Sequence, residues 1–142
     1  MDKLSPEERH YTMSRIRGKD TRPEVLVRKY LFGKGLRFRK NVRRLPGTPD
    51  IVLPKFKTVV FVNGCFWHGH EDCRYFILPS SNPEFWKAKI EKNQERDKRN
   101  QIALEALGWH VTNLWECELR TKALRKERLD DLYLEIIGQY RK

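Results

Sequence analysis

The sequence predicts a single α/β domain in which a mixed central β-sheet is flanked by helices. Two β-rich runs, residues 50–53 and 58–62, are separated by four residues, a length that suits a hairpin. The second run is apolar throughout, as expected of a central strand that is covered on both faces. Helical patterns occur on both sides of these runs, so a sheet with helices packed against it would bury the apolar surface.

The region before these runs predicts two helices. Ser5 with Glu8, and Thr21 with Glu24, have the spacing of a capping box, in which polar side chains bond free backbone N–H groups at a helix start. The first helix therefore begins near Ser5. The second begins near Thr21 and is expected to end at Gly33, because glycine commonly terminates helices.

The rest of the chain adds elements of the same kinds. They are a strand at 36–39, a turn at 45–49, a helix from Pro83 to about Leu107 that is capped by Asn82, a strand at 109–115, and a final helix with the apolar stripe Leu129, Leu132, Ile136 and Ile137. No linker, internal repeat or low-complexity tract divides the sequence. We therefore expect one domain over residues 1–142.

The charge of the chain favours a polyanionic partner. The formal net charge is +11, and residues 1–45 hold 14 basic and 5 acidic residues, a local excess of +9. This distribution is typical of proteins that bind nucleic acid, although a basic surface can also exist without a specific partner. We expect residues 1–20 to form a basic arm or helix that contacts DNA.

Composition also predicts a location. No apolar run approaches the roughly 20 residues of a membrane-spanning helix, and the first residues are polar, so we expect neither a membrane span nor a leader. Three cysteines are an odd number and cannot all pair within the chain. A reducing cytoplasm, in which cysteines bind metal rather than form disulfides, fits this composition best.

One short loop holds most of the metal-binding side chains. Cys65, His70 and Cys73 have the spacing of a zinc knuckle, and Cys117 is the remaining cysteine that could supply a fourth ligand. His68 is an alternative ligand to His70. Phe66-Trp67 lies inside this loop, where a rigid metal clip could hold both rings out toward a partner; core packing is the alternative.

Two carboxylates from separate elements form a candidate Mg²⁺ site. Asp50 follows Pro49 at the start of a strand, and Glu24 lies in the first turn of a helix. Mg²⁺ is usually held by one or two carboxylates together with water and phosphate oxygens. His68 follows the next strand, and histidine is suited to general-base catalysis. Alternatively, Glu24 only caps its helix, Asp50 is an ordinary turn residue, and His68 is a packed histidine.

Taken together, these segments resemble the very-short-patch mismatch-repair endonucleases, the Vsr family of the PD-(D/E)xK nuclease superfamily. The resemblance covers nearly the whole chain and is most specific in the block Gly64-Cys65-Phe66-Trp67-His68. The other matching segments are 20–24, 45–50, Gly69-His70, Phe85-Trp86, Asn93 with Arg96-Asp97, Gly108-Trp109 and Trp115-Glu116-Cys117. The resemblance implies a restriction-endonuclease-like fold with a structural zinc site.

The resemblance also implies an activity. Family members use Mg²⁺ to nick the thymine-containing strand on the 5′ side of a T·G mismatch that arises by deamination of 5-methylcytosine. By position, Asp50 and the main-chain carbonyl of Val62 would bind Mg²⁺. Glu24 and His68 would be catalytic. The structural Zn²⁺ would be bound by Cys65, His70, Cys73 and Cys117.

The family's DNA-binding aromatic residues correspond to Phe66, Trp67 and Trp86. Unstacking bases costs free energy, and costs less at a mispair, so a wedge of aromatic rings favours damaged DNA. For Trp86, which stands beside Phe85 on a helix, core packing is a competing interpretation.

Two features depart from the family pattern. One is the spacing of the zinc loop, where Glu71-Asp72 lies between His70 and Cys73; two intervening residues still let both side chains reach one ion. The other is a single residue. Asn63 stands where some members have a second catalytic histidine, and an amide can donate a hydrogen bond to phosphate but cannot act as an acid or base at neutral pH. The departure keeps open a nicking endonuclease of different specificity. A non-catalytic, zinc-stabilised DNA-binding module is a further alternative. A zinc hydrolase is the weakest alternative, because three cysteines and one histidine leave no open metal position.

The resemblance finally implies a cellular setting. We expect a monomer in the bacterial cytoplasm, associated with the nucleoid and acting on double-stranded DNA that contains a T·G mismatch. Mismatch-repair proteins are candidate further partners. The base context around the mismatch does not follow from a single sequence, because base-edge contacts depend on geometry.

Overall fold

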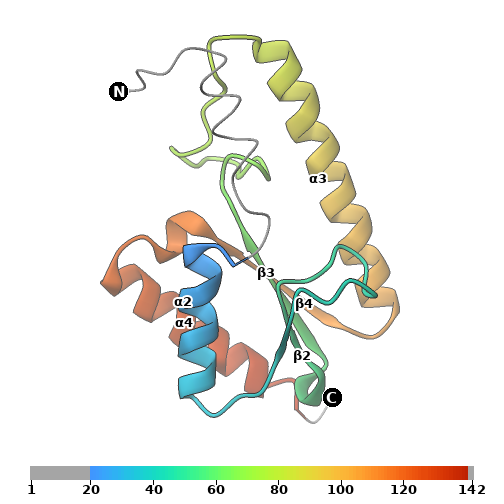
Figure 1. Ribbon diagram of the computed structural model, residues 1–142, viewed down its shortest axis with the longest axis vertical. Coiled ribbons are helices and arrows are strands. Elements are labelled where there is room, and N and C mark those ends of the chain that lie inside the picture. Colours follow the sequence, from blue (N-terminus) through green and yellow to red (C-terminus); the bar gives the residue numbers. More distant parts are fainter. Residues whose placement is uncertain (1–19, 141–142) are drawn as a thin grey trace.

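The computed structural model describes residues 20–140 and shows an α/β domain with a four-stranded sheet (Figure 1). Its described elements are α2 (Arg22–Gly33), β1 (Arg39–Lys40), β2 (Ile51–Leu53), β3 (Thr58–Asn63), α3 (Pro83–Ala106), β4 (His110–Trp115) and α4 (Lys122–Ile137), with short 3-10 turns at Pro54–Phe56 and Glu116–Leu119. The helix expected after Ser5 and the arm expected to contact DNA lie outside the described residues, except for Asp20.

The sheet is mixed, as predicted, and has the order β1-β2-β3-β4. β2 runs antiparallel to both β1 and β3, whereas β4 runs parallel to β3. A parallel pair needs a crossover connection, which the long helix α3 supplies. The carboxyl ends of β3 and β4 therefore lie side by side, with Asn63 opposite Trp115.

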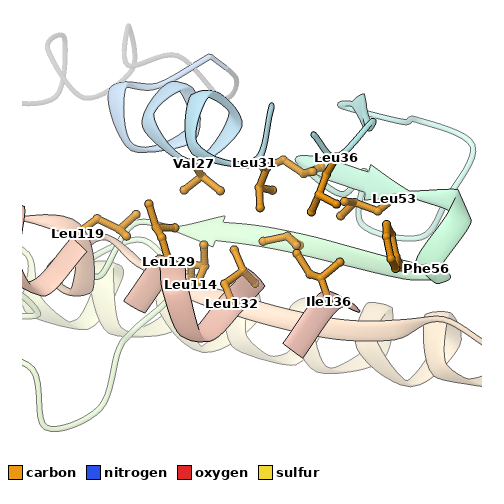
Figure 2. Packing of buried hydrophobic residues seen from close by; sticks show 12 residues of the cluster. Val27, Leu31, Leu36, Leu53, Phe56, Leu114, Leu119, Leu129, Leu132 and Ile136 are labelled. Atoms are coloured by element: carbon orange, nitrogen blue, oxygen red, sulfur yellow. The ribbon is translucent and has the colours of Figure 1, made fainter. Parts of the chain in front are cut away.

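The main hydrophobic core lies between the sheet and the layer formed by α2 and α4 (Figure 2). Val27 and Leu31 from α2 and Leu132 and Ile136 from α4 are fully buried there. Burial of each such side chain contributes roughly 1.5–3 kcal/mol. The predicted stripe of the final helix is confirmed except at Ile137, which is 37% exposed.

Helix α3 covers the opposite face of the sheet, where Val52, Val59 and Leu104 form a smaller cluster. Figure 1 shows α3 on one side of the strands and α2 with α4 on the other. The adjacent residues Val59 and Val60 are both completely buried, one in each cluster. The prediction that this strand is covered on both faces is confirmed.

Two local predictions differ from the structure. The strand expected at 36–39 is Arg39–Lys40, because Leu36 is buried directly after α2, where its N–H bonds the carbonyl of Leu31. The side chain of Asn82, expected to cap α3, makes no capping bond. Asn82 instead adopts a left-handed φ of 53°, which asparagine tolerates better than most residues.

Helix α3 has few apolar contacts for its length. Of its 24 residues, only Trp86, Ile90 and Leu104 are buried. Much of its contact with the rest of the domain must therefore be polar. Within residues 20–140, no helix is long and apolar enough to cross a membrane.

Candidate active site and metal centre

The candidate active site lies in a groove of about 1670 Å³ where β2 begins and β3 ends. Asp50 directly precedes β2, and its Oδ2 accepts a hydrogen bond from the backbone N–H of Val62 at 2.7 Å. The N–H and C=O of one strand residue point to the same side, so the Val62 carbonyl points to the side on which Asp50 lies. Burial raises the pKa of Asp50 to about 7, although the Val62 hydrogen bond lowers it.

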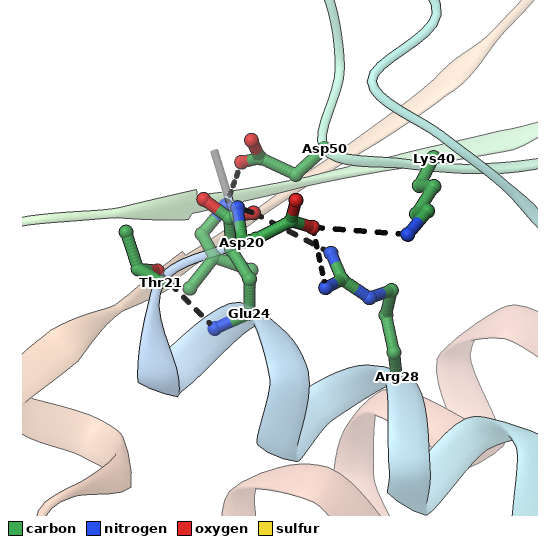
Figure 3. Close-up of polar contacts among 7 residues, drawn as sticks. Asp20, Thr21, Glu24, Arg28, Lys40 and Asp50 are labelled. Atoms are coloured by element: carbon green, nitrogen blue, oxygen red, sulfur yellow. Dashed lines mark hydrogen bonds and ion pairs between the residues drawn. The ribbon is translucent and has the colours of Figure 1, made fainter. Parts of the chain in front are cut away.

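Glu24 reaches the same groove from the first turn of α2. Its N–H donates to Oγ1 of Thr21 at 3.4 Å, so the Thr21 half of the predicted capping box is confirmed, whereas the Glu24 side chain bonds Asp20 rather than the Thr21 N–H. Its buried carboxylate accepts hydrogen bonds from the Asp20 N–H at 2.9 Å and from Arg28 at 3.5 Å (Figure 3). Burial raises the pKa of Glu24, although both contacts lower it. Glu24 can therefore lie in the cap of its helix and also place its carboxylate in the same groove as Asp50.

His68 enters the groove from the loop after β3. Its Nδ1 lies 2.5 Å from Oδ2 of Asp97 on α3. A carboxylate at Nδ1 fixes the orientation and tautomer of an imidazole and leaves Nε2 free to accept a proton. His68 also lies close enough to Asp50 to lower the pKa of that carboxyl, although burial has the larger, opposite effect.

The sequence alone assigns no function to Asp97, which enters only as part of a matching segment. Asp97 and His68 are 29 positions apart in the sequence, and this separation gives no sign of their contact. A signal does exist within α3, because Asn93, Gln94 and Asp97 share one helix face and all are polar. A long helix with so few buried apolar residues needs a polar contact surface, and these positions provide it.

One side-chain atom from each of Cys65, His70, Cys73 and Cys117 lies within 4.8 Å of all the others. Nδ1 of His70 is 3.5 Å from Sγ of Cys117, close to the separation of about 3.5 Å expected for nitrogen and sulfur ligands on one tetrahedral Zn²⁺. Burial raises the pKa of the Cys65 thiol, so the thiolate would need a cation beside it. These residues could hold a metal ion, and His68 is not among them.

The three predicted wedge residues form one aromatic cluster. The ring centroids of Phe66 and Trp67 are 5.3 Å apart, and they lie 5.7 and 5.9 Å, respectively, from that of Trp86. Phe66 and Trp67 are half-buried, whereas Trp86 is only 8% exposed. In this state, core packing therefore describes Trp86, and the other two rings rest on it. The ring of Phe85, whose centroid lies 5.1 Å from that of Trp86, is exposed.

Asn63 occupies the end of β3 and is only 8% exposed. Its Nδ2 donates to Oδ1 of Asn113 at 3.3 Å, and Nδ2 of Asn113 donates to Oε1 of Gln101 at 3.2 Å. All three residues line the groove. A chain of amides thus connects the end of β3 to α3.

The site has the composition of a nucleic-acid hydrolase. Asp50, whose pKa is raised by burial, lies in one groove with the pair His68 and Asp97. The same groove is lined by basic residues, namely Arg43, Arg96 and Lys98. The mixed sheet carries Asp50 at the start of a strand, as in restriction-endonuclease-like folds. The fold and site together define a DNA endonuclease.

The chain belongs to the DNA mismatch endonuclease Vsr family, whose model matches residues 1–74. It is 52% identical over 135 residues to the Type II nicking enzyme V.NmeAIP of Neisseria meningitidis, covering 95% of this chain and 96% of that relative. It is 43% identical over 123 residues to the DNA mismatch endonuclease Vsr of Escherichia coli, covering 87% and 76%. The family predicted from the sequence is confirmed.

Proposed function

We propose that this chain is a Mg²⁺-dependent endonuclease that nicks the thymine-containing strand on the 5′ side of a T·G mismatch produced by deamination of 5-methylcytosine. The observation that carries the proposal is the convergence of Asp50, Glu24 and His68 in one groove. The Escherichia coli relative is named a DNA mismatch endonuclease, which supports mismatched DNA as the substrate.

Asp50 and the main-chain carbonyl of Val62 would hold Mg²⁺. They fit such an ion because the raised pKa of Asp50, caused mainly by burial, makes an uncompensated carboxylate unfavourable there. Mg²⁺ binds through one or two carboxylates and keeps water or phosphate oxygens as its other ligands. When bound, the ion would neutralise charge on the scissile phosphate and orient the attacking water.

His68 is the proposed general base. Asp97 holds the proton at Nδ1, so Nε2 takes the proton of the attacking water as the new phosphorus–oxygen bond forms. The bond between phosphorus and the leaving oxygen of the nicked strand breaks, and that oxygen takes up a proton from water. Glu24 is the second catalytic carboxylate, held in place by Asp20 and Arg28. Asn63 would donate a hydrogen bond to phosphate through the amide N–H that is not given to Asn113. Its amide cannot act as an acid or base near neutral pH.

The remaining site residues would prepare the DNA and the loop. Phe66, Trp67 and Trp86 would wedge into the base stack beside the mispair, where unstacking costs least. Their mutual contacts form an aromatic cluster in which Phe66 and Trp67 are half-buried and Trp86 is buried, so Trp86 would reach the DNA only after a rearrangement. The cluster that includes Cys65 and Cys117 would hold a structural Zn²⁺, since four protein ligands leave no position for water.

Several wider expectations are part of the proposal. Residues 1–20 would contact the DNA backbone through their basic side chains. The chain would act as a monomer in the bacterial cytoplasm, in association with the nucleoid, and mismatch-repair proteins would be its further partners.

The test is a nicking assay on duplexes that differ only in T·G or C·G, with and without Mg²⁺. We expect cleavage of the T·G duplex in Mg²⁺ and none in a metal chelator. Equal cleavage of both duplexes would remove mismatch specificity. Absence of cleavage in either, with DNA binding retained, would favour a non-catalytic binding module.

A second candidate is a nicking endonuclease with a different recognition sequence or lesion. Its support is that the relatives from Neisseria meningitidis and Xanthomonas oryzae, 52% and 50% identical, are named Type II nicking enzymes. Asn63 is the residue at which the chemistry would differ. Nicking of a fully paired duplex, or of another mismatch, at least as fast as the T·G duplex would favour this second candidate.

A further inference from the structure

Two side chains of α3 donate hydrogen bonds to the backbone of the loop that follows β3 and contains His68. Nδ2 of Asn93 donates to the carbonyl of Trp67 at 2.9 Å, and Nε2 of Gln94 donates to the carbonyl of Gly69, also at 2.9 Å. The residue between these two carbonyls is His68. Two neighbouring amides on one helix therefore hold the main chain on both sides of the proposed general base.

The contact at Gly69 leaves no space for a side chain. Gly69 has a φ of +61°, and a Cβ there would lie 2.4 Å from Nε2 of Gln94 and 2.7 Å from a methyl group of Ile90. Glycine adopts this left-handed conformation at a lower cost than residues with a Cβ. The loop backbone and α3 are thus in direct contact at the residue that separates His68 from His70.

We propose that Asn93 and Gln94 form an amide clamp that positions His68 for catalysis. The inference rests on the proposed role of His68. Asp97 orients the imidazole ring, but it can do so only if the loop holds the ring at a fixed distance from α3. The two amides fix that distance.

The expected cost of losing the clamp follows from geometry. Misplacement of a catalytic group by about 1 Å can lower a rate by about 100-fold. A positioning residue acts on the chemical step, so its loss should lower the rate of nicking by bound enzyme without weakening DNA binding. A residue that merely stabilised the fold would not show this separation.

The first test compares Gln94→Leu with Glu95→Leu, a control at the next position, which is exposed. We expect Gln94→Leu to lower the single-turnover rate in Mg²⁺ at least tenfold and to leave the DNA dissociation constant within about twofold. Asn93→Leu should give the same separation. Circular dichroism and thermal denaturation identify any variant that fails to fold, and the remaining clamp variant then carries the test.

The second test repeats Gln94→Leu in a His68→Ala background. If the clamp acts through His68, removing it there causes no further loss of rate. An equal loss in both backgrounds would overturn the clamp and assign Gln94 a structural role. A wild-type rate for His68→Ala would instead refute the proposed general base. A wild-type rate for Gln94→Leu, with His68→Ala impaired, would refute the clamp alone.

Discussion

Asp50 shows, at the scale of a single residue, how the fold creates a place for a cation. Burial raises the pKa of its carboxyl to about 7, and nearby negative charge on Glu24 raises it further, while the N–H of Val62 acts in the opposite direction. A carboxylate in this position is unfavourable unless positive charge compensates it. The residue is therefore costly to the metal-free protein, and this cost can be measured.

The substitution Asp50→Asn should stabilise the metal-free protein in a pH-dependent way. Because the folded-state pKa is raised, the protonated carboxyl contributes stability that is complete below the ordinary aspartate pKa and is lost as the pH rises through about 7. Asp50→Asn has no carboxyl to ionise at this position, so its stability does not fall in this way as the pH rises. Thermal denaturation in a chelator should show equal melting temperatures near pH 4 and a higher one for the variant above pH 7.

Addition of Mg²⁺ supplies the control for this prediction. The ion should raise the melting temperature of the wild type above pH 7 and leave that of Asp50→Asn nearly unchanged. A constant difference between the two proteins from pH 4 to pH 8 would show that the carboxyl does not carry the predicted penalty.

At this scale, the sequence predicts the chemistry of individual residues better than their contacts. Thr21 and Glu24 are readable as a helix cap because capping depends on local spacing. The contact of His68 with Asp97 cannot be predicted from the sequence, because it depends on how α3 packs across the sheet. The same holds for the amide chain from Asn63, which depends on the register between β3 and β4.

At the scale of elements, β3 and its following loop determine the site. The apolar run of β3 predicts a central strand, and Val59 and Val60 confirm it because each is buried in a different cluster. The left-handed start of α3 at Asn82 was not predictable, since the residue type suits both a side-chain cap and a left-handed backbone.

The substitution Gly69→Ala tests the contact between the loop and α3. The added methyl group meets Gln94 and requires a strained positive φ, so we expect a loss of about 1–3 kcal/mol in the free energy of unfolding. Denaturant titration measures this loss. Gly33→Ala is the matched control, because a Cβ at Gly33 would meet no atom within 4 Å, and this substitution should be neutral or slightly stabilising.

Equal stability of the two glycine variants would contradict the close approach of α3 to the loop. A loss confined to Gly69→Ala would support it. The comparison is informative because both substitutions add the same methyl group, and only one of them meets neighbouring atoms.

At the scale of the whole molecule, the proposed metal cluster joins distant parts of the chain. Cys65, His70 and Cys73 come from one loop, whereas Cys117 follows β4. A bound ion would therefore cross-link the loop after β3 to the end of β4, beside the active site. Spacing in the sequence predicts the three ligands in the loop, whereas Cys117 is predicted as the fourth ligand only because it is the remaining cysteine.

Metal removal should loosen this connection. We expect about one zinc per chain in the purified protein, and a strong zinc chelator should lower its melting temperature by several degrees. Cys117→Ser should lower it similarly and make the chelator less effective. Native protein that contains no zinc, or that melts identically with and without the chelator, would contradict the structural zinc site.

The central claim is that Asp50 belongs to a metal-dependent site that cuts one strand beside a T·G mismatch. Its most direct test is single-turnover nicking of a T·G duplex, with each strand labelled separately, by the wild type and by Asp50→Asn. We predict a Mg²⁺-dependent nick 5′ of the thymine for the wild type, and a rate at least about 1000-fold lower for the variant with DNA affinity retained. A variant that nicks at the wild-type rate, or a wild type that cuts both strands equally, would contradict the account.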